Sequence, residues 1–453
     1  MSKKRQLDLT NGPIMKTLAE LALPIMASSF LATAYNITDM AWIGLLGAKA
    51  VAGVGMGGMY VWLSQGLCSL ARMGGQVNLA QSCGRGDQRS AQDYASAAIQ
   101  LTLLFAVLFS AVCLAFTNPL LSFFHLDDPQ TFAYANIYMK ITCGLIIFSY
   151  MNYTLTGLYT AQGDSKTPFI ANLIGLVMNM ILDPILVLGP GPLPRLEVAG
   201  AAIATVIAQM IVMIVMIVGI FIGKDNENIL RKIKLFSKVP RSCYQSICRI
   251  GGPTALQGTL YCMISMVLTR MVSAFGPGAV ATQRVGGQIE SISWNTADGF
   301  AAALNSFTAQ NYGAKKNQRI HDGYRASLRI MVSWGILVTV LFVLFPRQIS
   351  SVFFHEPEVI GTSVGYMIII GLGEAFLCVE MLTIGALSGL GRTTLCSVIS
   401  ILLTGARIPL ALILTKTALG LTGIWWALTI SSIAKGIVFY LAFQKVDRSL
   451  VKN

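Results

Sequence analysis

Long apolar stretches dominate this sequence, and short polar segments separate them. One stretch runs from Val198 to Ile222 with Gln209 as its single strongly polar interruption, and another runs from Ile330 to Phe345. A helix needs about 20 mainly apolar residues to cross a bilayer. The stretches and the turn residues between them predict twelve membrane-spanning helices, over residues 14–45, 51–83, 91–117, 131–161, 167–189, 197–222, 244–273, 279–312, 322–345, 358–389, 394–415 and 421–444.

The composition agrees with a chain that lies mostly in a membrane. Of its 453 residues, 54% are hydrophobic and 12% are charged. A soluble domain carries about 25% charged residues. The formal net charge of +13 comes from basic residues in the short loops, which favours a membrane protein over one that binds nucleic acid. The nine cysteines form no CxxC pair, so neither a zinc site nor a disulfide framework is indicated.

Lysine and arginine are distributed unevenly between two sets of loops. One set contains the basic N-terminus, the segment from Lys224 to Arg241, and the C-terminal Lys445 and Arg448. The other set has few basic residues and several acids. Because basic loops stay on the cytoplasmic side, both termini are predicted to be cytoplasmic. The predicted location is the plasma membrane, which is the cytoplasmic membrane of a prokaryote.

The two halves of the chain resemble each other at a constant spacing. Residues related by a shift of 229 include Pro24 and Pro253, Gly47 and Gly276, and Ala80-Gln81 and Ala309-Gln310. Six spans in each repeat preserve the direction of the chain, so we predict an all-α polytopic membrane protein of two parallel-repeat six-helix bundles (6+6). The predicted parts are an N-terminal lobe (1–223), a cytoplasmic linker (224–243) and a C-terminal lobe (244–453). Two such bundles are typical of transporters that work by alternating access.

Four oxygen-bearing residues inside the spans of the first half could form one site. Asp39 lies well inside the first span, Asn179 and Asp183 lie one turn apart on the fifth, and Thr205 lies inside the sixth. Two carboxylates, an amide oxygen and a hydroxyl suit a small hard cation or a shared proton. The structural alternative is that these polar groups only hold helices together.

The second half lacks this acidic set and has other charged residues instead. Glu374 and Glu380 lie in the tenth span, six residues apart and therefore on different faces of the helix. One of them could form a salt bridge with Arg407 or Arg284, or they could bind a cationic substrate. The sequence leaves both interpretations open.

Several motifs resemble those of the multidrug and toxic compound extrusion (MATE) transporters. They are Ala22-Leu23-Pro24-Ile25, Asp39, Ala80-Gln81-x-x-Gly84 with its repeat Ala309-Gln310-x-x-Gly313, Gly163 to Pro168, and Asn179 to Pro184. The resemblance covers essentially the whole chain, and the order of the motifs within a 6+6 repeat is specific. It implies an antiporter that exports organic cations or drugs, driven by inward gradients of Na⁺ or H⁺.

The resemblance also implies roles for individual residues. In the branch that resembles bacterial damage-inducible and archaeal members, an Asp on the first helix, an Asn and an Asp on the fifth and a Thr on the sixth bind the coupling cation. The matching positions in this sequence are Asp39, Asn179, Asp183 and Thr205. Another branch uses acids on the seventh and tenth helices, and this sequence departs from that pattern.

Three further residues are predicted to line a substrate cavity: Tyr35, one turn before Asp39, together with Glu374 and Arg407. No cofactor is expected besides the coupling ion, which is Na⁺ or H⁺. The expected partners are small organic cations and the lipid bilayer, with no nucleic acid. The resemblance implies a monomer.

Other functions fit the sequence less well. A lipid-linked precursor flippase of the same superfamily would have a cationic central cavity, which Arg72, Arg270, Arg284 and Arg407 favour and the acidic set of the first half opposes. An enzyme is not indicated, because the chain has no HExxH pair, no Walker A sequence and no cluster among its three histidines. A passive channel would show flux that is independent of cation gradients.

Overall fold

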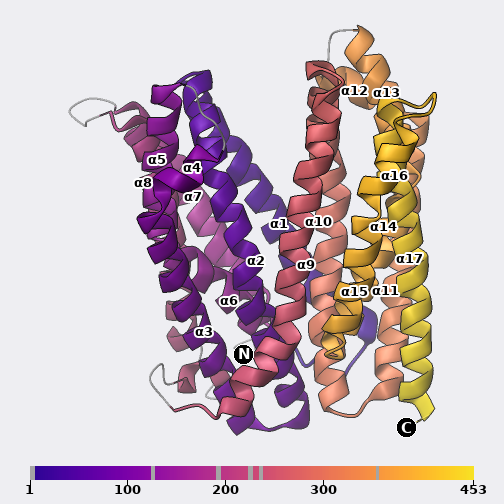
Figure 1. Cartoon of the computed structure of the whole chain (residues 1–453). Helices are drawn as coiled ribbons and strands as arrows, with labels where there is room; N and C mark the ends of the chain where they lie inside the picture. Colours follow the sequence, from indigo (N-terminus) through magenta and orange to yellow (C-terminus); the bar gives the residue numbers. More distant parts are fainter. Residues whose placement is uncertain are drawn as a thin grey trace. The chain divides into compact units, whose positions relative to one another are not determined.

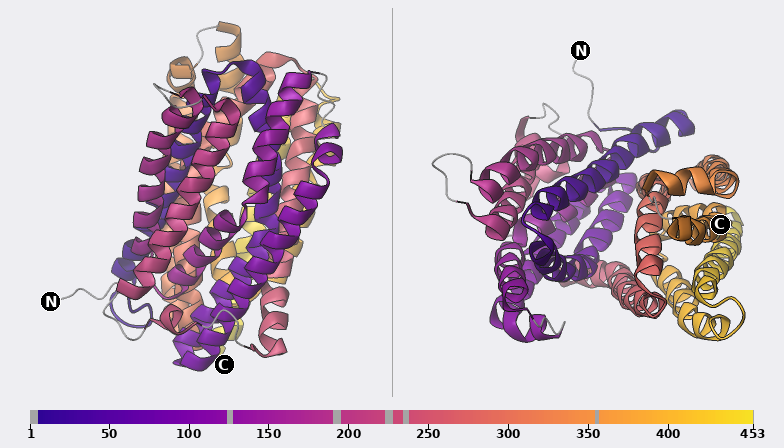
Figure 2. Two further views of the ribbon diagram at one scale, coloured as in Figure 1. Left: turned by 90° about the vertical axis from the view of Figure 1, so that its left-hand side faces the viewer. Right: turned by 90° about the horizontal axis from the view of Figure 1, so that it is seen from above.

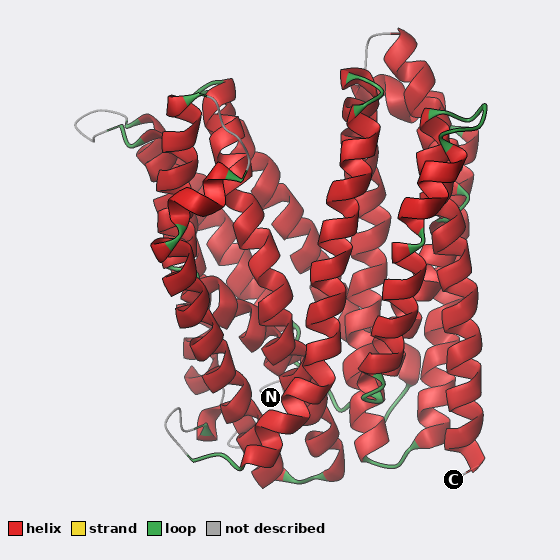
Figure 3. Cartoon of the chain, viewed as in Figure 1, coloured by secondary structure: helices red, strands yellow, loops and turns green. Residues whose placement is uncertain are grey.

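The structure is a computed structural model that describes residues 6–123, 128–189, 195–222, 228–233, 238–353 and 357–452. These described residues are almost entirely helical, and none of them belongs to a β-strand (Figure 3). The helices form two compact units, each made of two separate stretches of chain. The first unit contains residues 1–8 and 27–255, and the second contains residues 9–26 and 256–453.

Within the first unit the long helices run alongside one another (Figures 1 and 2). The helices that lie wholly or largely in it are α1 (Ile14–Gly44), α2 (Ala48–Arg85), α3 (Gln88–Ala115), α4 (Thr117–Ser122), α5 (Pro129–Gly144), α6 (Ile147–Ala161), α7 (Lys166–Leu188), α8 (Glu197–Ile222) and the short 3₁₀ helix η1 (Ile229–Lys232).

The second unit has the same kind of bundle. Its helices are α9 (Arg241–Ser273), α10 (Pro277–Gly313), α11 (Asn317–Leu344), α12 (Pro346–Phe353), α13 (Pro357–Gly371), α14 (Glu374–Gly389), α15 (Thr393–Gly405), α16 (Arg407–Leu414) and α17 (Leu421–Lys452).

One helix or one pair of helices occupies each of the twelve predicted spans. Among the described residues, eight segments are long and apolar enough to cross a membrane, including the α15–α16 segment. The pairs α5–α6 and α13–α14 also qualify, with bends of 48° and 47° at their breaks. The two remaining spans are α2 and α10, helices of 38 and 37 residues that carry more small and polar side chains. This arrangement confirms the predicted all-α architecture of twelve spans in two bundles.

The two repeats share backbone conformation as well as sequence. Gly47 before α2 has φ 100° and ψ 171°, and Gly276 before α10 has φ 97° and ψ 172°. A positive φ of this kind favours glycine, because a Cβ atom would clash with the backbone. These two equivalent positions of the repeat therefore keep glycine for the same conformational reason.

The fourth span of each repeat is broken, and a hydroxyl of the third span supplies a replacement hydrogen bond. Ser110 Oγ on α3 donates to the carbonyl oxygen of Cys143 near the end of α5, at 2.8 Å. Thr339, the repeat equivalent of Ser110 on α11, donates from Oγ1 to the carbonyl oxygen of Gly371 at the end of α13, at 2.7 Å. Such carbonyls need a partner in the protein, because the bilayer core offers no water. The second break places Glu374 at the start of α14.

The boundary between the two units falls inside two helices that the repeat relates. α1 belongs to the second unit up to Met26, and α9 belongs to the first unit up to Ala255. Both boundaries follow closely after a helix proline, Pro24 in α1 and Pro253 in α9. Residues 244–255 thus pack in the first unit, although the predicted C-terminal lobe begins at 244. Residues 224–227 and 234–237 of the predicted linker lie outside the described residues, and the division into 1–223, 224–243 and 244–453 stays a prediction.

The first half of α9 packs so closely on α2 that one glycine has no room for a side chain. A Cβ atom at Gly251 would lie 1.9 Å from the carbonyl oxygen of Leu70, which belongs to the backbone of α2. We expect Gly251→Ala to destabilise the protein by about 1–3 kcal/mol, as overpacking in a core does. The melting temperature of the purified protein measures the effect.

Gly252 provides a matched control on the same helix. A Cβ atom at this position meets no other atom within 4 Å. Because alanine is the better helix former, by about 1 kcal/mol, Gly252→Ala should leave the melting temperature unchanged or raise it. Equal melting temperatures for the two variants would contradict the close packing of α9 on α2.

Candidate functional site

The first unit holds a group of buried and half-buried polar side chains from three helices. Asp39 lies on α1, Asn179 and Asp183 lie on α7, and Thr205 lies on α8. Asp39 is 7% exposed, and the two α7 residues are fully buried. These are the four residues predicted to bind the coupling cation.

Interactions within this polar group link the three helices. Asn179 donates from Nδ2 to Asp183 Oδ1 at 3.1 Å, across the single helical turn that separates them. The carboxyl groups of Asp39 and Asp183 interact electrostatically. Tyr35, one turn before Asp39, interacts with both carboxyl groups and lies next to Thr205. The structure therefore brings the four predicted ligands together, with Tyr35 among them.

Four buried oxygen atoms of the predicted ligands have no hydrogen-bond partner, namely Asp39 Oδ1, Asn179 Oδ1, Asp183 Oδ2 and Thr205 Oγ1, and the adjacent Tyr35 Oη has none either. Leaving one such atom unsatisfied costs about 1–3 kcal/mol. Oxygen atoms of carboxylates, amides and hydroxyls are the ligands that hard cations prefer, and paired carboxylates can also share a proton. The donor set therefore fits Na⁺ or H⁺. Within the described ranges, no three Asp, Glu, His or Cys side chains gather into a metal-binding group.

Apolar packing and a small cavity adjoin the polar group. Tyr138 on α5 packs in a core cluster with Ile43 and Val187, and it interacts electrostatically with Asp39 and Asp183. Tyr138 is absent from the predicted set, because nothing in the sequence relates a tyrosine of the fourth span to an aspartate of the first. A cavity of about 110 Å³ lies beside Tyr35.

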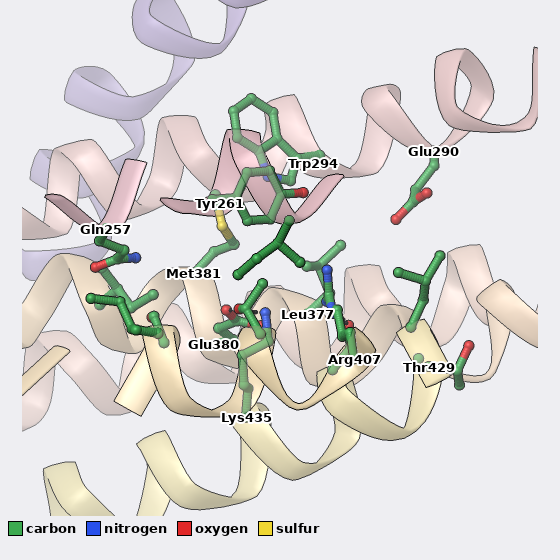
Figure 4. Close-up of a pocket in the computed structure, with 18 of the residues that line it drawn as sticks. Gln257, Tyr261, Glu290, Trp294, Leu377, Glu380, Met381, Arg407, Thr429 and Lys435 are labelled. Carbon is green, nitrogen blue, oxygen red and sulfur yellow. Dashed lines mark hydrogen bonds and ion pairs between the residues drawn. The ribbon is translucent and has the colours of Figure 1, made fainter. Parts of the chain in front are cut away.

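A larger cavity lies within the second unit, with a volume of about 360 Å³. Its lining comes from α9, α10 and the helices from α13 to α17. Figure 4 shows Tyr261 and Trp294 on one side of this cavity and Glu380, Arg407 and Lys435 on the opposite side. Ionisable residues inside a membrane bundle are costly and usually mark a functional site. We call this space the second-unit cavity.

Two charged residues of the second-unit cavity form a buried ion pair. Lys435 Nζ on α17 lies 2.8 Å from Glu380 Oε1 on α14, and the two side chains are 4% and 7% exposed. Arg407 donates from Nε to Ser431 Oγ and from Nη2 to Ser432 Oγ, at 3.1 Å each. Glu380 therefore pairs with a lysine, and the suggestion that it pairs with Arg407 or Arg284 is wrong. Lys435 is absent from the predicted set, although a lysine inside the apolar stretch of the last span was a usable signal.

The three predicted substrate residues separate into two places. Glu374 and Arg407 line the second-unit cavity, whereas Tyr35 lies beside the polar group of the first unit. Glu374 is 1% exposed, and neither of its carboxyl oxygens has a hydrogen-bond partner.

The family model for MatE matches two segments of the chain, residues 24–185 and 253–413. The matches begin at Pro24 and Pro253, which are equivalent positions of the two repeats, and together they cover well over half of the sequence. The chain belongs to the MatE family. One MatE match therefore falls on each repeat, and the first contains Asp39, Asn179 and Asp183.

Curated MatE relatives align with this chain over nearly its whole length. A probable multidrug resistance protein NorM of Thermotoga maritima is 27% identical, covering 97% of this chain and 94% of the relative. An FAD transporter of Shewanella oneidensis is 24% identical (97% and 96%), and the multidrug export protein MepA of Staphylococcus haemolyticus is 23% identical (97% and 95%). All three carry the names of transport or drug-resistance proteins, which agrees with the expectation that the chain is not an enzyme.

Solved structures share the fold. A crystal structure of MATE in the bent conformation superimposes with a TM-score of 0.91 at 22% identity, covering 100% of this chain and 99% of the other. A MOP superfamily transporter from Pyrococcus furiosus, described as having a binding pocket of reverse polarity, gives a TM-score of 0.90 at 23% identity, with 100% of both chains covered. These similarities identify the architecture as that of MATE transporters.

Proposed function

We propose that this MatE protein is a cation-coupled antiporter that exports organic cations by alternating access. The observation that carries the proposal is the group of four partnerless oxygens on Asp39, Asn179, Asp183 and Thr205. The names of the multidrug relatives support the class of substrate.

The polar group would serve as the coupling site. Two carboxyl groups held near each other in an apolar bundle repel when both are charged, and a bound cation removes that repulsion. Asn179 and Thr205 add neutral oxygens, which can hold the cation without adding further negative charge. Binding of the ion then favours one conformational state of the transporter, and binding of the substrate favours the other. The ion gradient therefore drives export through the coupling free energy between the two sites.

The chain is a multi-pass membrane transporter, and its bacterial relatives indicate a cell membrane. We propose a monomer in the prokaryotic cytoplasmic membrane with both termini in the cytoplasm. The concentration of lysine and arginine in one set of loops supports this orientation. The lobes 1–223 and 244–453 would be the two moving parts, and 224–243 would connect them.

The flippase alternative is not favoured. Its cationic cavity would need the arginines of the spans to gather, but within the second unit Arg407 is buried whereas Arg270 and Arg284 are exposed. Arg407 lines the second-unit cavity and is held by two serines. The Arg72 guanidinium lies 4.1 Å from the centre of the Tyr153 ring in the first unit.

Proteoliposomes loaded with ethidium test the proposal. We expect an imposed Na⁺ or pH gradient to accelerate dye release, because the oxygen donor set accepts either ion. The gradient that accelerates release identifies the coupling ion. Dye release at a rate independent of both gradients would indicate a passive channel. The absence of any dye release would contradict export of organic cations.

A further inference from the structure

The second-unit cavity contains five ionisable side chains whose charges do not balance. Glu290, Glu374 and Glu380 are acidic, and Arg407 and Lys435 are basic. Glu380 and Lys435 neutralise each other at 2.8 Å. Arg407 interacts electrostatically with Glu290. This pairing leaves the carboxyl group of Glu374 without a compensating positive charge.

The surroundings of Glu374 do not supply a partner either. The ionisable groups that interact with it are Glu290, Tyr366 and Cys378, none of which carries a positive charge, and the Ser293 hydroxyl lies close to its carboxyl group. Glu290 also accepts a hydrogen bond from Tyr366 Oη at 3.4 Å. Both oxygens of Glu374 are buried and without a hydrogen-bond partner, and the side chain lines the cavity. A buried acceptor of this kind needs a donor, which a ligand in the cavity can bring.

The backbone around Glu374 holds the side chain in place. Glu374 is the first residue of α14, directly after the break that follows α13. Thr429 Oγ1 on α17 donates to the carbonyl oxygen of Ile369 on α13, at 2.8 Å. Thr339 Oγ1 donates to the carbonyl oxygen of Gly371. The break is therefore a stable feature of the fold.

The rest of the cavity suits an aromatic ring. Tyr261 on α9 and Trp294 on α10 lie together on the side opposite Arg407 and Lys435 (Figure 4). Aromatic faces attract both apolar rings and cations. The volume of about 360 Å³ is near the lower end of the range of about 300–1,000 Å³ for small-molecule sites. A cavity of this volume accommodates a single aromatic ring or a pair of fused rings.

We propose that the second-unit cavity binds a small aromatic monocation, with the ligand's ammonium group on Glu374 and its ring against Tyr261 and Trp294. The inference rests on the proposed function only in taking this ligand as a transport substrate. One positive charge on the ligand balances the cavity, and ammonium N–H groups satisfy the two partnerless oxygens. The cavity would discriminate against neutral and anionic compounds of the same shape.

Binding of two compounds of matched shape tests the proposal on the purified full chain, without any ion gradient. The probes are 1-naphthylmethylammonium and its neutral counterpart 1-naphthylmethanol, measured by calorimetric titration. Because hydrogen bonds to a charged group are strong, we expect the affinity for the ammonium compound to exceed that for the alcohol by about ten- to a hundredfold. Glu374→Gln keeps the size of the side chain, so we expect it to remove the preference while the affinity for the alcohol stays the same.

Two further variants serve as controls for effects that do not come from the charge of Glu374. Trp294→Ala should lower the binding affinity for both compounds by similar factors, because it removes the contact with the ring and leaves the charge of Glu374. Asp322→Asn removes an exposed carboxylate elsewhere in the second unit and should change neither affinity.

Several outcomes would overturn the inference. They are an unchanged preference in Glu374→Gln, equal affinities of the unmodified protein for the two probes, or stabilisation by Na⁺ alone with no binding of either naphthyl compound. The proposed function is tested separately, because its failure appears as absent gradient-driven efflux even where the ammonium probe binds.

Discussion

Asp39→Asn is expected to reduce gradient-driven efflux of an organic cation strongly. Asparagine has nearly the same shape as aspartate, but it neither carries the negative charge nor exchanges a proton. Asp183 would then face a neutral amide across the polar group, and the cation would lose one of its two charged ligands. Coupling between two sites is typically worth about 1–3 kcal/mol, so the loss in the driven rate should be about 5- to 150-fold. Dye release from proteoliposomes under the effective gradient measures it.

Two comparisons show whether the loss is specific to coupling. Asp322→Asn makes the same chemical change at an exposed position of α11 and should retain full efflux. Substrate binding without a gradient should survive in Asp39→Asn, because the second-unit cavity lies in another unit. If Asp39→Asn exported the dye at the normal rate, the polar group would be a structural contact and the coupling site would have to lie elsewhere.

The architecture was predictable because the membrane imposes strong constraints on the sequence. Apolar stretches, together with the turn residues between them, located all twelve spans, and the constant shift between matching motifs located the repeat. Breaks within spans were not predicted. The bend before Glu374 leaves the hydrophobic pattern intact, and the hydroxyls that stabilise it, Thr339 and Thr429, lie on other helices.

The candidate sites were predictable to different degrees. Asn179 and Asp183 are neighbours on one helix, so their spacing alone indicates that they meet, and they do so at 3.1 Å. Contacts between helices carry no such local signal. Lys435 reaches Glu380 from a helix 55 positions later in the chain. Spacing within a helix therefore predicts pairs, whereas the partners of a buried charge depend on the packing of the bundle.

Lys435→Met is expected to destabilise the protein strongly, because it leaves the Glu380 carboxylate buried without its counter-charge. Breaking a buried ion pair from one side typically costs about 3–5 kcal/mol. Methionine fills a similar volume, so little of the loss should come from packing. The free energy of unfolding in mixed detergent micelles measures the effect. Glu380→Gln should be destabilising for the converse reason, since it leaves the lysine unpaired.

The double variant Glu380→Gln with Lys435→Met should recover most of the lost stability, because neither charge then remains buried. Lys49 and Asp128 form a matched pair at the same N–O distance of 2.8 Å, but their side chains are 56% and 38% exposed. The nearby Lys49 ammonium holds the pKa of Asp128 at about 2, so this carboxylate is ionised at neutral pH. Solvent screens such a pair, and Lys49→Met should have little measurable effect. A double variant as unstable as Lys435→Met would mean that the ion pair itself, rather than the burial of an uncompensated charge, governs the stability of this bundle.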